Sequence, residues 1–129
     1  MAFVRVSKPI RYHRGTPTIT IAGGNGKSAP YLALNSTTRS MLGNPAAAVF
    51  DWDQGRSLLR ITICDPTDPD AYRITKIGRM NVTRLYRQIG VDPVGVTRIP
   101  VQRDGRLAVI ADLSDIPLAN PAKLARRAA

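Results

Sequence analysis

The chain has 129 residues and a mass of 14.0 kDa, a size typical of one domain or of two small units that share a core. Hydrophobic residues make up 43% of it, which excludes a wholly disordered chain. The net charge is +10, because 19 Lys and Arg face nine acidic residues, and this balance favours a polyanionic partner.

Residues 1–16 are expected to form a basic N-terminal arm. The only histidine, His13, lies between Arg11 and Arg14. A metal site or a catalytic triad built on His13 would need all its other members from elsewhere in the chain. We therefore interpret the arm as a phosphate-contacting segment.

Residues 17–63 contain the element order strand, strand, helix, strand, strand. The glycine-rich stretch 23–26 predicts a hairpin turn after the first strand. Asn35 or Ser36 can cap the short helix, which Gly43 ends. The predicted strands are 17–21, 31–34, 47–52 and 58–63, and the helix lies within 35–43.

Gly-Lys-Ser at positions 26–28 superficially matches the end of a nucleotide-binding loop, but the spacing fails. The first glycine of that motif would fall on Ile21, and Pro30 blocks a helix starting at Lys27. We interpret this stretch as a hairpin turn. No catalytic residue, metal ligand or cofactor site is predicted anywhere in the chain, which we expect to be non-enzymatic.

The aromatic residues Phe50 and Trp52 alternate on one predicted strand. They are expected to pack in the core, because proteins that bind single-stranded nucleic acid usually spend more aromatic residues on their surface. Recognition of single strands or RNA is therefore the weaker variant of the polyanion hypothesis.

The segment 64–71 is rich in Pro and Asp and is predicted to be an exposed linker. Its cysteine, Cys64, is the only one in the chain, which excludes an intramolecular disulfide and any cluster of cysteines around a metal. We expect an inert, partly buried thiol, since no neighbouring Cys or His activates it.

Residues 72–112 repeat the order of the first unit. The predicted strands are 72–75, 79–82, 96–101 and 107–111, and the helix lies within 83–91. Ile89-Gly90 stands where Leu42-Gly43 stands in the first unit, and the terminal hairpins turn at Gly55-Arg56 and Gly105-Arg106. Residues 113–129 are predicted to be a basic C-terminal tail.

Neither unit has enough apolar material to fold alone. We therefore predict one domain over 17–112, mainly β, with about eight strands and two short helices on its exterior. Two ββαββ repeats would be related by a pseudo-twofold axis, each completing the sheet of the other. The chain would then be a pseudo-dimeric monomer, on which any higher oligomer is built.

No stretch is long and apolar enough for a membrane span, and the N-terminus has no apolar run typical of a secretion signal, so we expect a cytoplasmic protein.

The repeated unit resembles the swapped-hairpin DNA-binding domain of the AbrB/SpoVT family, and tandem copies in one chain are similar to the MraZ regulators. The second unit reads Gly78-Arg79-Met80-Asn81-Val82 and then Leu85-Tyr86-Arg87-Gln88-Ile89-Gly90. The first reads Tyr31-Leu32-Ala33-Leu34 and then Thr38-Arg39-Ser40-Met41-Leu42-Gly43. The resemblance implies a swapped-hairpin barrel and a transcriptional regulator that binds duplex DNA.

The predicted DNA-binding residues are arginines of the two units and of the two arms. Arg84 and Arg87 are three apart, which places them on one face of a helix. We expect the loss of Arg79, Arg84 and Arg87 to weaken binding more than the loss of Arg98, Arg103 and Arg106. The full set is Arg39, Arg79, Arg84, Arg87, Arg11, Arg14, Arg126 and Arg127.

A second hypothesis from a different class stays open. Small proteins of actinobacterial phages also resemble this chain, and such proteins often bind host proteins. Asn35 and Thr83 stand where the AbrB/SpoVT family has Pro. The chain would then be a phage-encoded accessory or virion protein, located in the host cytoplasm or the virion, whose basic surface meets an acidic protein partner.

Overall fold

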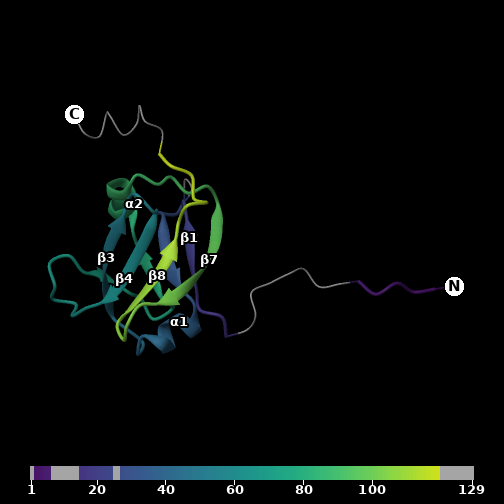
Figure 1. Ribbon diagram of the computed structural model, residues 1–129, viewed down its shortest axis with the longest axis horizontal. Coiled ribbons are helices and arrows are strands. Elements are labelled where there is room, and N and C mark those ends of the chain that lie inside the picture. Colours follow the sequence, from purple (N-terminus) through teal and green to yellow (C-terminus); the bar gives the residue numbers. More distant parts are fainter. Residues whose placement is uncertain (1, 7–14, 25–26, 120–129) are drawn as a thin grey trace.

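A computed structural model describes residues 2–6, 15–24 and 27–119, which form a mainly β structure with two short helices (Figure 1). The predicted mainly β class with about eight strands is confirmed. The elements are β1 (Thr18–Ala22), β2 (Tyr31–Leu34), α1 (Ser36–Met41), β3 (Ala47–Asp53), β4 (Leu58–Ile63), β5 (Tyr72–Arg73), β6 (Arg79–Asn81), α2 (Thr83–Ile89), β7 (Val96–Arg103) and β8 (Ala108–Asp112).

The strands form one antiparallel sheet in the order β5-β3-β4-β8-β7-β1-β2-β6. The two outer strands come together where the backbone N–H of Thr75 donates to the Arg79 carbonyl at 3.0 Å. The sheet is therefore a nearly closed barrel, which leaves little unpaired strand edge.

Strands from the two halves of the chain alternate in pairs around the barrel. β1 pairs with β7, β2 with β6, β3 with β5 and β4 with β8. Each strand before the 64–71 linker thus has a neighbour from after it. The pairing explains why one core serves the whole chain.

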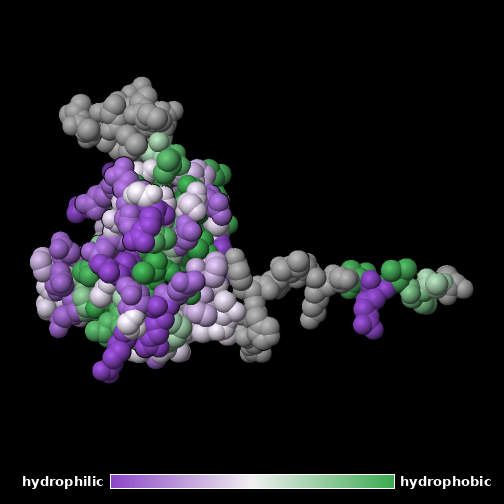
Figure 2. Space-filling model, viewed as in Figure 1, coloured by the Kyte–Doolittle hydropathy of each residue, from purple (hydrophilic) through white to green (hydrophobic). Residues whose placement is uncertain are grey.

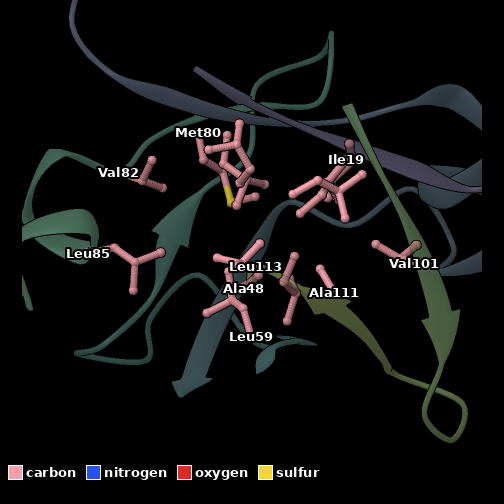
Figure 3. Packing of buried hydrophobic residues seen from close by; sticks show 14 of the residues in the cluster. Ile19, Ala48, Leu59, Met80, Val82, Leu85, Val101, Ala111 and Leu113 are labelled. Atoms are coloured by element: carbon pink, nitrogen blue, oxygen red, sulfur yellow. The ribbon is translucent and has the colours of Figure 1, made fainter. Parts of the chain in front are cut away.

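The core fills the barrel with side chains from alternate positions of the strands (Figure 3). Ile19 and Ile21 on β1, and Leu59 and Ile61 on β4, are fully buried. Phe50 and Trp52 pack against this core but are only half-buried. The prediction that these two aromatics belong to the core is therefore right about their contacts and too strong about their burial.

The helices lie at opposite ends of the barrel (Figure 1). Of the two predicted caps, Asn35 and Ser36, the structure has Asn35 capping α1, because its Oδ1 accepts from the backbone N–H of Thr38 at 2.8 Å. The helix α2 has no side-chain cap at its start, and it ends at Gly90, which has a left-handed backbone. Tyr86 anchors α2 to the sheet, since its hydroxyl donates to the Tyr31 carbonyl at 2.7 Å. Burial raises the pKa of Tyr86 far above its usual value.

The folded body extends beyond residue 112. Leu113, Ile116 and Ala119 are buried. Leu118 forms an antiparallel bridge with Val91, and the Ala119 N–H donates to the Gly90 carbonyl at 2.8 Å. The first seven residues of the predicted tail therefore pack against the barrel at the α2 end.

The linker 64–71 is ordered by its own side chains. The Asp65 carboxylate accepts from the backbone N–H of Thr67 at 2.9 Å and from its hydroxyl at 2.8 Å, and these bonds lower the pKa of Asp65. Asp68 makes a similar turn by accepting from the N–H of Asp70 at 2.9 Å.

Neither helix in the described ranges is long and apolar enough to cross a membrane.

Candidate nucleic-acid interface

The barrel has a basic half and an acidic half. The strands β7, β1, β2 and β6 carry three arginines and no carboxylate, and we call them the basic half-sheet. The strands β5, β3, β4 and β8 carry three aspartates and two arginines. Positive charge on the sheet is therefore concentrated on four adjacent strands.

Two of these arginines stand on one row across the outer face of the basic half-sheet. The register pairs Arg98 with Thr20, Thr20 with Ala33, and Ala33 with Arg79. Residues directly opposite each other on antiparallel strands point to the same face of a sheet. Arg98 and Arg79 are exposed. The small, half-buried side chains of Thr20 and Ala33 lie between them. Three strand spacings separate the two arginines by roughly 14 Å along the sheet.

Tyr31 holds the Arg79 side chain in place. The guanidinium carbon of Arg79 lies 3.9 Å from the centre of the Tyr31 ring, a cation–π contact. Tyr31 is itself half-buried, and its carbonyl accepts the Tyr86 hydroxyl from α2. The cation is therefore positioned by the sheet and by α2 together.

Arg39 holds a turn. Its Nη1 donates to the Lys76 carbonyl at 2.7 Å, and its Nε is buried without a hydrogen-bond partner among the described residues. The Gly78 Cα lies directly beside its side chain, in the turn between β5 and β6. The structure thus gives Arg39 a structural contact, and its predicted role in DNA binding stays a prediction.

Gly78 is expected to be indispensable for this turn. Its φ is +82°, and an added Cβ would lie 2.5 Å from the Leu34 carbonyl oxygen and 2.8 Å from Arg39 Cδ. Gly78→Ala should lower the free energy of unfolding by about 3 kcal/mol, because left-handed strain and a backbone clash combine.

The matched control is Gly105→Ala, where φ is +79° and no atom lies within 4 Å of an added Cβ. It should cost about 1 kcal/mol in the same urea titration. Equal losses would contradict the close packing of Arg39 on the turn.

Arg84 faces a different environment from Arg79. It lines a cavity of about 520 Å³ between β3, the linker and α2, which Asp51, Asp68 and Asp70 also line. Arg84 and Arg87 are both exposed on α2, three residues apart. Arg84 therefore lines a cavity together with aspartates, whereas Arg79 packs on Tyr31, and the structure does not group the two arginines.

Several other arginines are engaged elsewhere. Arg56 pairs with Asp53 at 2.8 Å, and this hydrogen bond lowers the pKa of the Asp53 carboxyl. Arg60 lies 3.5 Å from an Asp51 oxygen and 3.6 Å from an Asp104 oxygen. Arg103 donates to the carbonyls of its own hairpin turn. The predicted arm residues Arg11, Arg14, Arg126 and Arg127 lie outside the described residues.

The sequence places Arg98 in the set of arginines expected to matter less for binding, whereas the structure places it on one row with Arg79. Its place on the same row as Arg79 follows from the pairing of β7 with β1, of β1 with β2 and of β2 with β6. No local pattern around Arg98 carries that information. Only the hydrophobic alternation of β7, with Ile99 and Val101 buried, indicates that Arg98 points outward.

The described ranges contain no group of three or more His, Cys, Asp or Glu residues that could hold a metal ion. Cys64 is half-buried, and desolvation raises the pKa of its thiol.

Comparisons with models of protein families, with curated proteins and with solved structures found no match.

Proposed function

We propose that the protein is a non-enzymatic DNA-binding protein that contacts the phosphates of duplex DNA with its basic half-sheet. The observation that supports this best is the row Arg98, Thr20, Ala33 and Arg79, which presents two exposed arginines over a floor of small side chains without a carboxylate on the same strands. Arginine is suited to this task because its planar guanidinium forms paired hydrogen bonds with phosphate oxygens.

The separation of Arg98 and Arg79 fits the distance between the two phosphate backbones that border a DNA groove. Arg98 and Arg79 lie roughly 14 Å apart along the sheet, and the major groove of DNA is about 12 Å wide. The length of an arginine side chain lets each guanidinium contact one edge of the groove. Such contacts position the protein on the duplex and carry no sequence information.

We extend the proposal to the origin of the fold. The two halves are copies of one swapped-hairpin unit, and the chain is an AbrB-like regulator with the tandem arrangement of the MraZ proteins. In support, the cyclic order of the strands is unchanged when β1 to β4 are exchanged with β5 to β8. The exchange also carries α1 at one end of the barrel onto α2 at the other (Figure 1).

Duplex DNA is expected to bind with a steep dependence on salt. Each neutralised phosphate contributes about 0.9 to the slope of log affinity against log salt, so two contacts give a slope of about −1.8 and contacts from the arms add to it. Fluorescence anisotropy of a labelled random duplex measures this between about 50 and 200 mM salt. Binding no tighter than that of a neutral protein of equal size at about 50 mM salt would refute the proposal.

The basic half-sheet could also bind an acidic surface of another protein. A pulldown from the native host distinguishes DNA binding from binding to a protein partner. A set of co-purifying proteins that nuclease treatment removes supports DNA binding. One nuclease-resistant protein at constant stoichiometry, combined with no measurable affinity for the duplex, would instead make the chain an accessory or virion protein.

A further inference from the structure

Part of the edge of β3 has no neighbouring strand. β3 pairs with β4 over Ala48–Asp53, but it pairs with β5 only at Ala47 and Ala48. No described strand pairs with residues 49–53 on the β5 side. We call this stretch the open edge. An unpaired edge offers backbone N–H and C=O groups to an additional strand.

Alternation along the strand identifies the backbone groups on the open edge. The Ala46 carbonyl accepts from the Ile74 N–H, just after β5, at 2.9 Å. Residues two apart in a strand direct their backbone groups to the same side, so those of Ala48, Phe50 and Trp52 also face the β5 side. β5 provides a partner for Ala48 and ends there. The N–H and C=O groups of Phe50 and Trp52 therefore have no partner among the described residues.

The cavity of about 520 Å³ lies beside the open edge, between β3, the linker 64–71 and α2. Its apolar lining includes Phe50, Tyr72 and Leu85, and the rings of Phe50 and Tyr72 meet edge to face at 5.1 Å. Phe50 is only half-buried, although Ile61, directly opposite on β4, is fully buried. The side chains along the open edge are thus incompletely covered.

The charge of this cavity is opposite in sign to that of the whole chain. Three aspartates and one cation, Arg84, line it, and the net charge of the chain is +10. Asp51 already lies 3.5 Å from Arg60, whereas Asp68 and Asp70 form no ion pair with any described residue. Figure 2 shows the linker, at the left edge of the view, as largely hydrophilic. The cavity is therefore complementary to a basic ligand.

We propose that the open edge binds an extended, basic segment of a partner protein, which adds a strand to the barrel. The backbone of the segment forms hydrogen bonds with Phe50 and Trp52, as in other cases of strand addition. Successive side chains of an extended segment point to opposite sides, so one set packs on Phe50 and Leu85 and the other carries Lys or Arg to Asp68. Residues 49–53 span about 14 Å, which matches a segment of about five residues.

This inference is independent of the proposed DNA binding, because the open edge and its cavity contain none of the arginines of the basic half-sheet. Failure of one proposal would leave the other standing. A peptide and a DNA duplex would occupy different halves of the barrel.

Fluorescence anisotropy with the full chain and a labelled hexapeptide, Lys-Val-Lys-Val-Lys-Val with blocked ends, tests the proposal. This peptide should bind at least about tenfold more tightly than Glu-Val-Glu-Val-Glu-Val. Non-specific attraction to a chain of net charge +10 favours the acidic peptide, so the expected preference reports the cavity. No binding of the basic peptide, or tighter binding of the acidic one, would overturn the proposal.

Methylation of the peptide backbone tests strand addition itself. One peptide carries N-methyl groups on its three valines and a second on its three lysines. Only one of the two sets directs its N–H groups to β3, so one peptide should lose at least about tenfold in affinity and the other should keep most of it. Equal affinities of the two methylated peptides would show that charge alone holds the peptide, and would overturn the proposed added strand.

The acidic side of the cavity is tested with Asp68→Asn/Asp70→Asn, which should weaken binding of the basic peptide about fivefold. Asparagine at position 68 keeps the oxygen that accepts from the N–H of residue 70. The matched control is Asp104→Asn/Asp115→Asn, which neutralises two exposed carboxylates outside the cavity and should bind as wild type does. Equal losses from both pairs would overturn the assignment to the cavity. Thermal unfolding followed by circular dichroism checks that the variants fold.

The variant Lys123→Ala/Arg126→Ala/Arg127→Ala tests whether a segment of the chain itself occupies the cavity. A partner protein as the occupant predicts that this variant binds the basic peptide as wild type does. Binding at least about tenfold tighter than that of wild type would show that the chain's own tail competes for the cavity. That result would overturn the proposal of a partner protein.

Discussion

Replacing Arg79 and Arg98 together by alanine is expected to weaken binding to duplex DNA at least about tenfold at 50 mM salt. Both side chains are exposed on one row of the basic half-sheet. Each lost phosphate contact lowers the salt slope by about one, so the double variant should lose about two from the slope. The reduction should be similar for all duplex sequences, because phosphate contacts carry no sequence information. Fluorescence anisotropy at several salt concentrations measures both quantities.

The matched control is Arg56→Ala/Arg60→Ala, which also removes two positive charges, one on β4 and one in the turn between β3 and β4. Arg56 and Arg60 already face carboxylates at distances between 2.8 and 3.6 Å, so their charges are largely compensated. This control should change affinity and slope much less. Equal losses from both double variants would show that net charge alone drives binding and that the basic half-sheet is no defined interface.

Residues 1–66 and 67–129, produced as separate chains, are expected to be unfolded or aggregated apart and to recover β structure when mixed. Each strand of the first fragment has a neighbour from the second, and separation removes the pairings of β1 with β7, β2 with β6, β3 with β5 and β4 with β8. The first fragment alone retains two isolated hairpins, which are marginally stable in water. It also loses the barrel interior that buries Ile19 and Leu59.

Circular dichroism and thermal unfolding of each fragment and of their mixture provide the measurement. As a control, the intact chain can be cut within the exposed linker 64–71 after folding, and the two pieces should stay together in gel filtration. A cooperative thermal transition of a monomeric 1–66 fragment would show that the halves are independent domains. That outcome would contradict the single shared core.

The local sequence determined most of the elements of this protein. Alternation of buried residues at Ile19 and Ile21, and at Leu59 and Ile61, predicted strands that the structure contains. Asn35 predicted the start of α1, because an Asn side chain satisfies a free backbone N–H in the first turn. These signals act over a few residues, so a single chain carries them without knowledge of its partners.

The tertiary structure alone decided which arginines share a surface. Arg98 and Arg79 stand on one row because β7 pairs with β1, β1 with β2 and β2 with β6 in one particular register. The predicted residues Arg39 and Arg84 instead face a turn and a cavity with carboxylates. Residues 113–119 likewise join the barrel, although their sequence lacks a strand-like alternation. The physical reason is that pairing and register between distant strands are set by burying the apolar faces of the whole chain at once, which no short segment specifies.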